Sequence, residues 1–177
     1  AVWASAPNDV FAVGGNGTVA LIAHFGGAAW SMTSHGGYSL YDVWGSSGAD
    51  VYAVGWGGVL HYDGAEWTTV SDGPGGGGAV WGASSGDVFV AEWEAEGPVI
   101  WRYNGAAWGT SYSDQGDPIV DLWGSAVDDV FAVRSTGVLH YDGSAWTAAG
   151  DGTVSGRAVW GSSESDVYVV GSGSLWH

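Results

Sequence analysis

The chain has 177 residues, enough for one domain with a sizeable core, and its 33 glycines and 13 tryptophans favour short strands and tight turns over helices. It has 19 acidic residues but only three arginines and no lysine, which gives a formal net charge of -16. Binding to nucleic acid or anionic lipid is disfavoured, because it depends on cationic groups. The lack of cysteine excludes disulfides and thiolate sites, and no apolar run reaches the roughly 18 residues of a membrane-inserted span.

One motif occurs five times along the chain. Its copies read VWASAPNDVFAVG, VWGSSGADVYAVG, VWGASSGDVFVAE, LWGSAVDDVFAVR and VWGSSESDVYVVG, and their tryptophans stand 41, 37, 42 and 37 residues apart. A period of this length indicates a repeat architecture. We therefore predict a single domain, 1–177, made of the units 1–40, 41–77, 78–119, 120–156 and 157–177, the last being partial.

Each unit is predicted to form four short strands. In the second unit these strands cover 40–45, 50–55, 58–62 and 66–70. Within 50–55 the alternation places Tyr52 and Val54 on one face and Val51 and Ala53 on the other, so both faces must be covered. This predicts an all-β fold, a β-propeller of about five four-stranded blades whose last blade is incomplete. A solenoid is the alternative, because a repeat period alone does not show closure.

The pattern VWGSS…DVYAVG…GVLHYDG…W resembles the blade repeats of bacterial surface-associated β-propellers, and more distantly it is similar to Kelch and Asp-box repeats. It departs from an Asp-box because Asp63 and Trp67 stand one residue closer together, and it lacks the terminal Trp-Asp pair of WD repeats. The resemblance covers the whole chain. It implies a binding or scaffold module, by analogy only, because propellers carry many different activities.

Several polar and aromatic residues recur with the repeat. They are the aspartates Asp9, Asp50, Asp87, Asp129 and Asp166, and the ladder His24, His61, Arg102, His140 and His177. The ladder residue follows its aspartate by 11 residues in units two, four and five and by 15 in units one and three. We expect the aspartates to accept backbone amide hydrogen bonds at turns and the ladder to be a repeated packing and hydrogen-bonding element, so no catalytic and no metal-binding residue is assigned.

The repeated tryptophans are predicted to be core residues packed between blades. They are Trp3, Trp44, Trp81, Trp123 and Trp160 on the first strand and Trp30, Trp67, Trp108 and Trp146 on the fourth. The glycine-rich stretch 73–78 lacks the lysine and hydroxyl residue of a phosphate-binding loop, so we expect a flexible linker between two blades.

Residues that break the repeat are better candidates for ligand binding. Trp56, Trp93 and Arg134 follow the second strand of neighbouring units, and Glu92 and Glu94 lie in the insertion of the third unit. Aromatic rings flanked by charged groups are suited to sugar recognition. We predict a ligand-binding edge built from these five residues, with loop decoration or contact with a neighbouring chain as the alternative.

The predicted function is a non-catalytic, extracellular or cell-surface binding module for a carbohydrate or a protein. No cofactor is expected, although calcium is a cation that the negative charge would attract. A structural propeller fragment completed by another chain, or by self-association, is one alternative, because the last unit leaves an unpaired strand edge. A glycoside hydrolase is the other, although no unique pair of carboxylates stands out from the repeat.

Overall fold

The computed structural model describes residues 1–150, 154, 156–171, 173 and 175–177, and strands are the only regular elements in those ranges. The first sheet contains β1 (Val2–Ala6), β2 (Asp9–Gly15), β3 (Val19–Phe25) and β4 (Trp30–Gly36). The second contains β5 (Leu40–Ser47), β6 (Asp50–Gly55), β7 (Gly58–Tyr62) and β8 (Trp67–Thr69). The third contains β9 (Ala79–Ser84), β10 (Asp87–Glu94), β11 (Gly97–Tyr103) and β12 (Trp108–Ser113).

The fourth sheet contains β13 (Ile119–Ala126), β14 (Asp129–Arg134), β15 (Gly137–Tyr141) and β16 (Trp146–Ala149). The fifth contains β17 (Ala158–Ser163), β18 (Asp166–Val170) and β19 (Leu175–Trp176). Every sheet is an antiparallel meander of consecutive strands, four in each of the first four sheets and three in the last. The predicted strands 50–55 and 58–62 coincide with β6 and β7, whereas β5 runs further and β8 is shorter than expected.

The hairpin tips follow the turn chemistry of the sequence. Asp63 Oδ1 accepts hydrogen bonds from the backbone N–H groups of Ala65 and Glu66, and Gly64 has a φ of 93°. Asp142 makes the equivalent bonds in the fourth sheet, beside Gly143. A short acceptor side chain followed by a residue free to adopt positive φ closes these hairpins.

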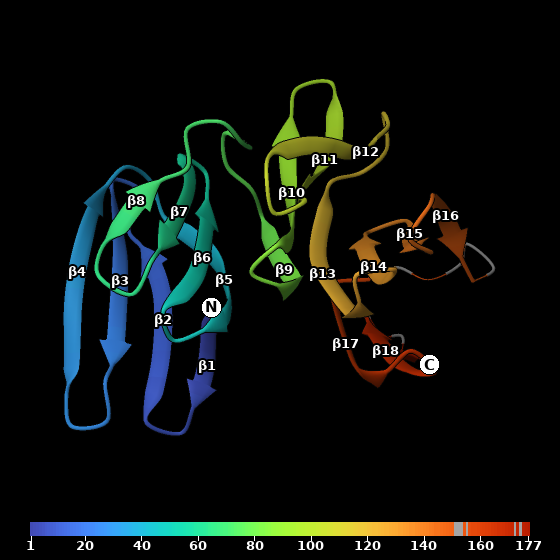
Figure 1. Ribbon diagram of the computed structural model, residues 1–177. Coiled ribbons are helices and arrows are strands. Elements are labelled where there is room, and N and C mark those ends of the chain that lie inside the picture. The colour runs from blue at the N-terminus through green and yellow to red at the C-terminus, as the bar shows by residue number, and fades with distance from the viewer. Residues whose placement is uncertain (151–153, 155, 172, 174) are drawn as a thin grey trace.

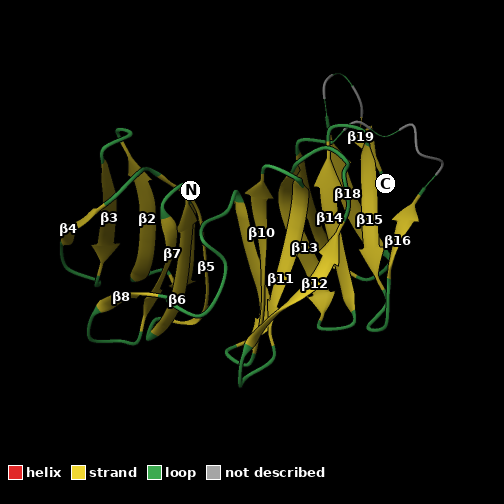
Figure 2. Ribbon diagram, turned by 90° about the horizontal axis from the view of Figure 1, so that it is seen from above, coloured by secondary structure: helices red, strands yellow, loops and turns green. Residues whose placement is uncertain are grey.

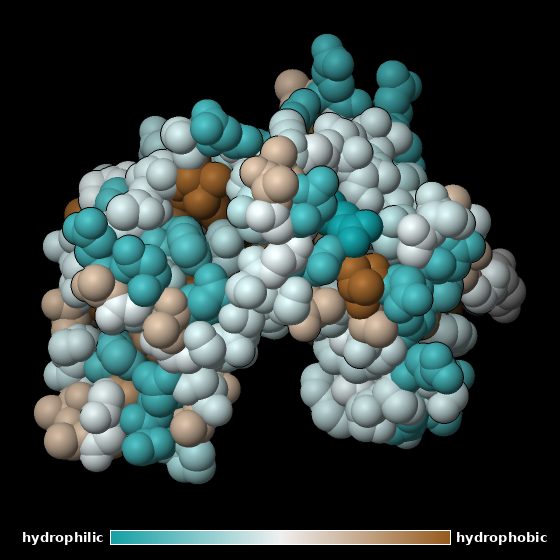
Figure 3. Space-filling view, viewed as in Figure 1, coloured by the Kyte–Doolittle hydropathy of each residue, from teal (hydrophilic) through white to brown (hydrophobic). Residues whose placement is uncertain are grey.

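The sheets form blades arranged in an arc. The first strands β1, β5, β9, β13 and β17 lie side by side in that order, on the inner side of the arc (Figure 1). In the view from above, the first two blades lie at one end and the strands of the fourth and fifth blades lie at the other (Figure 2). The space-filling view shows an opening between the first and the last blade (Figure 3). The described residues therefore form an arc of propeller blades rather than a closed ring.

The hydrophobic core lies between the blades. Phe11 and Ile22 of the first blade pack against Val51 and Leu60 of the second, and all four side chains are buried. The opposite face of β6 packs through Tyr52 and Val54 against the third blade. Both faces of the second strand are thus covered, as the sequence predicted.

Seven of the nine repeated tryptophans are packed against these clusters, but Trp30 and Trp160 are 54% and 61% exposed. The prediction that all nine are core residues was wrong for these two. The first-strand tryptophans pack on the following blade and the fourth-strand tryptophans on the preceding one. Trp160 lies on the outer face of the last blade and Trp30 on that of the first, where the described structure provides no neighbouring sheet.

Candidate functional site

The aspartate series and the histidine ladder pair with each other across the second and third strands of each blade. Nε2 of His61 lies 2.7 Å from Asp50 Oδ1, while Ser46 Oγ donates to Asp50 Oδ2 at 2.5 Å. The imidazole also stacks on Tyr52, with 4.3 Å between ring centroids. The same serine, aspartate and histidine arrangement occurs in the first, fourth and fifth blades.

These aspartates have a structural role, as expected, but the expected partners were wrong. Their carboxylates accept hydrogen bonds from a serine and a histidine rather than from backbone amides. In the first blade the hydrogen bond from Ser5, and then the bond from His24, lower the pKa of Asp9. The available signal was that both residues recur in every unit on consecutive strands, where residues of a hairpin face each other.

The third blade replaces both partners of its aspartate. Ala83 stands where the other blades have serine, and Arg102 stands where they have histidine. Arg102 Nη2 lies 2.6 Å from Asp87 Oδ1, and Nη1 donates to the hydroxyl of Tyr141 in the next blade at 3.3 Å. The arginine therefore keeps the ion pair within its own blade and adds a contact to the fourth.

Two carboxylates on inner strands, which the sequence analysis did not single out, join neighbouring blades. Asp42 Oδ2 accepts the backbone N–H of Val80 at 2.9 Å, and Asp121 Oδ2 accepts that of Val159 at 2.7 Å. Burial raises the pKa of Asp121 to about 6, and the negative charge of Asp42 adds to this rise. The hydrogen bonds that Asp121 accepts from the backbone oppose it in part. The signal was the residue before the Val/Leu-Trp pair, which reads Ala1, Asp42, Ala79, Asp121 and Ala158 in successive units.

Two of the predicted ligand-binding residues lie together where the second and third blades meet. Trp56 follows β6, Trp93 is near the end of β10, and their ring centroids are 6.3 Å apart. Tyr41 extends the group on the other side of Trp93, with a centroid distance of 5.7 Å. Trp56 is 62% exposed and Trp93 37%, so the aromatic surface is open to a ligand.

Trp93 is held in place by its neighbours. Its indole N–H donates to the carbonyl oxygen of Ile119 in the fourth blade at 3.1 Å. Its ring lies so close to Gly78 that a Cβ at that position would stand 2.2 Å from Cζ2. The hydrogen bond and the close contact fix the ring before any ligand arrives.

A cleft of about 60 Å³ is lined by Trp56, Gly75, Gly76, Gly77, Glu92 and Trp93. We call it the tryptophan cleft. Glu92 Oε1 accepts the backbone N–H of Gly75 at 2.9 Å. Burial raises the pKa of the Glu92 carboxyl, although the indole N–H of Trp101 and the backbone N–H of Gly75 oppose this effect.

The stretch 73–78, expected to be flexible, is packed into this region. Gly77 N–H donates to the carbonyl of Gly55, and Gly78 N–H donates to that of Ala91, both at 2.9 Å. A Cβ at Gly76 would stand 2.5 Å from the carbonyl oxygen of Gly55. Glycine is therefore needed here for close approach of the backbone, and the stretch forms one wall of the tryptophan cleft.

Glu94 and Arg134 lie outside the tryptophan cleft. Glu94 lines a separate cleft of about 350 Å³ together with Glu96, Trp101 and Asp114. Arg134 Nη1 lies 2.7 Å from Asp114 Oδ2, in an ion pair between the third and fourth blades. Burial acts in the opposite direction, but hydrogen bonds from Arg134 and Tyr112 lower the pKa of Asp114. Of the five predicted residues, the structure thus brings Trp56, Trp93 and Glu92 into one site.

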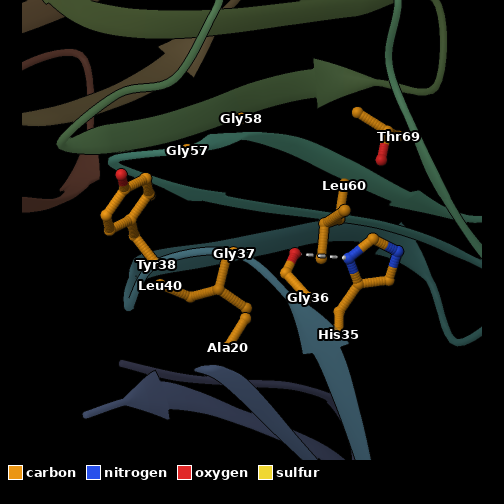
Figure 4. Close-up of a pocket in the computed structure, with 11 residues that line it drawn as sticks. Ala20, His35, Gly36, Gly37, Tyr38, Leu40, Gly57, Gly58, Leu60 and Thr69 are labelled. Atoms are coloured by element: carbon orange, nitrogen blue, oxygen red, sulfur yellow. Dashed lines mark hydrogen bonds between the residues drawn. The ribbon is translucent and has the colours of Figure 1, made fainter. Parts of the chain in front are cut away.

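A second, narrower groove of about 40 Å³ lies between the first and second blades (Figure 4). Five of its eleven lining residues are glycines, and His35, Tyr38 and Thr69 supply its polar side chains. The His35 ring donates from Nδ1 to the carbonyl of Gly36 at 3.2 Å. This groove has fewer aromatic side chains than the tryptophan cleft and no carboxylate.

Within the part of the chain that the structure describes, no three histidine or acidic side chains are grouped closely enough to hold a metal ion. A search of the same residues for a helix long and apolar enough to cross a membrane found none.

No protein-family model and no curated protein matches the chain. Among solved structures, it is similar to a chain of the nidogen/laminin complex, with a TM-score of 0.68 and 12% identity over 96% of this chain and 70% of the other. It also matches the structure of YCF48 bound to a D1 peptide, with a TM-score of 0.44 and 14% identity over 95% of this chain and 73% of the other. The repeated antiparallel blades and the first of these similarities define the chain as a β-propeller.

Proposed function

We propose that the chain is a non-catalytic, extracellular binding module that recognises a protein through the edge carrying the tryptophan cleft. The main observation is that Trp56 and Trp93, which break the repeat, lie 6.3 Å apart and remain exposed beside the carboxylate of Glu92. Exposed tryptophans are enriched among the residues that dominate protein interfaces. The similar nidogen chain was solved in a complex with laminin, a further argument for a protein ligand.

The test is a binding screen against arrays of peptides and glycans, run with and without calcium. The wild-type protein is compared with Trp56→Ala and with the double variant Trp56→Ala, Trp93→Ala. Trp30→Ala is the matched control, because it removes an exposed tryptophan from the outer strand of the first blade. Circular dichroism shows whether each variant is folded, and the single Trp56 variant serves if loss of the Trp93 hydrogen bond perturbs the fold.

We expect peptide binding that Trp56→Ala weakens and Trp30→Ala leaves unchanged. Binding that no tryptophan variant alters, or no binding at all, would contradict the proposal. Binding confined to glycans would replace the protein ligand by a carbohydrate. Dependence on calcium would add a cofactor to the site.

A second candidate is a structural role through the outer face of the last blade. Trp160 is 61% exposed, whereas Trp123 packs against Gly161 of the following blade in the equivalent position. An uncovered face that repeats an internal interface can receive another sheet of the same kind. Light scattering coupled to gel filtration tests this candidate, because a monomer of 18.1 kDa at high concentration would rule out stable self-association.

A further inference from the structure

We infer that the tryptophan cleft receives a cationic side chain, the ammonium group of a lysine or the guanidinium group of an arginine, presented by a protein partner. The inference rests on the proposed function and specifies the chemistry of the partner at that site. It is argued from the arrangement of the rings, the size of the cleft and its charge.

The two indole rings are placed to hold a cation. Tryptophan is the aromatic side chain that attracts cations most strongly, and the attraction acts within about 6 Å of the ring centroid. Trp56 and Trp93 pack against each other, with 6.3 Å between ring centroids, and both line the cleft, so a cation in the cleft lies beside both rings. Because Ile119 and Gly78 already fix Trp93, little ordering of this ring accompanies binding.

The cleft has room for a side-chain head group. One water molecule needs only about 10–15 Å³ of space of this kind, and the cleft offers about 60 Å³. An ammonium group with its last methylene fits into this space beside Glu92 and the two rings.

The charge of the cleft favours a positive partner. Glu92 accepts a hydrogen bond from Gly75, and the side chains of Arg102 and Arg134 are paired elsewhere, with Asp87 and Asp114. Partial burial raises the pKa of the Glu92 carboxyl, and a nearby cation would stabilise its charged form. The net charge of -16 also attracts basic partners at long range.

The test uses small probes and nuclear magnetic resonance of the tryptophan indole N–H groups. Nα-acetyl-lysine methylamide and Nα-acetyl-arginine methylamide are titrated into the isotope-labelled protein. Nα-acetyl-norleucine methylamide is the uncharged control with a side chain of similar length. We expect the two cationic probes to shift the Trp56 and Trp93 signals in a saturable way, with affinity at least fivefold higher than that of the norleucine probe.

The charge contribution is tested with Glu92→Gln, which is expected to weaken the cationic probes about fivefold or more. Glu96→Gln is the matched control, because it removes the same charge from the same hairpin but does not line the tryptophan cleft. If both variants weakened the cationic probes equally, the net charge of the protein would explain the attraction, and the inference would be overturned.

Equal binding of norleucine and lysine would also overturn it, while leaving a protein-binding edge in place. If no probe binds, the cationic site is rejected, and the array experiment with Trp56→Ala decides the proposed function separately. The two failures therefore remain distinguishable.

Discussion

The indole ring of Trp44 in the second blade lies against Gly82 in the third, and a Cβ added at Gly82 would stand 2.5 Å from Cη2 of Trp44. The same contact joins Trp3 to Gly45, Trp81 to Gly124 and Trp123 to Gly161. The Val/Leu-Trp-Gly motif therefore encodes an interface between blades. Its tryptophan packs on the next blade, and its glycine receives the tryptophan of the preceding one.

Gly82→Ala is expected to lower the free energy of unfolding by about 1–3 kcal/mol, because the added methyl group overpacks the contact with Trp44. Urea denaturation followed by circular dichroism measures the change. The matched control is Gly109→Ala in the same blade, where nothing lies within 4 Å of the added Cβ. If both variants lost the same stability, the general cost of replacing glycine would account for the effect and the contact would not.

The loss of stability caused by replacing a first-strand tryptophan should depend on whether a following blade covers its ring. Trp44→Ala is expected to lower the free energy of unfolding by about 3 kcal/mol, because it empties a packed position between two blades. Trp160→Ala should change it by about 0.5 kcal/mol or less, since that ring is 61% exposed. The same denaturation experiment compares them, and a large loss for Trp160→Ala would show that its face is covered in solution.

The repeat was sufficient to predict the fold because each blade obeys the same local rules. Apolar residues alternate on both faces of the second strand, and Asp-Gly pairs mark the hairpin tips. The strand limits of β6 and β7 follow directly from these signals. The exposure of Trp30 and Trp160 could not be predicted, because burial depends on a neighbouring sheet, whereas these tryptophans occupy the same repeat positions as the buried ones.

The candidate site was only partly predictable. Position in the repeat placed Trp56 and Trp93 on the same edge, and the structure brings their rings together. The repeat could not show that Arg134 forms an ion pair with Asp114. The two residues belong to different blades, and their contact depends on the conformations of their side chains. The sequence also gave no reason to expect packing in the stretch 73–78, since glycine is typical both of loose loops and of close backbone contacts.

The aspartate and histidine pairs are expected to contribute to stability in proportion to their burial. Asp50→Ala should lower the free energy of unfolding by about 1–3 kcal/mol, because it leaves Ser46 and His61 without their shared acceptor. Asp166→Ala should cost clearly less than Asp50→Ala, since the Asp166 and His177 side chains are 38% and 55% exposed. Thermal and urea denaturation test the order, and a reversed order would show that the repeated pair stabilises the blades by another route.

Asp121 should make the stability depend on pH in the opposite direction to a carboxylate with a lowered pKa, such as Asp142. Its folded pKa of about 6 lies above the ordinary value of 3.8, so the folded state holds the proton more tightly between these values. The contribution of Asp121 is thus most favourable below about pH 4 and is lost as the pH rises to about 6. Asp142, whose pKa is lowered to about 2 by Ser144 and Ala145, contributes stability that is lost as the pH falls towards that value.

The measurement is the difference in free energy of unfolding between the wild type and Asp121→Asn at several pH values. The asparagine has one acceptor oxygen for the N–H groups of Leu122 and Val159, so the variant should be less stable throughout. The decisive quantity is the slope, and the wild-type advantage should shrink from about pH 4 to about pH 6. Asp142→Asn is the control, and its difference from the wild type should instead change below about pH 4. A wild-type advantage over Asp121→Asn that stayed constant across this range would show that Asp121 keeps an ordinary pKa and that the bonds between blades compensate fully for its burial.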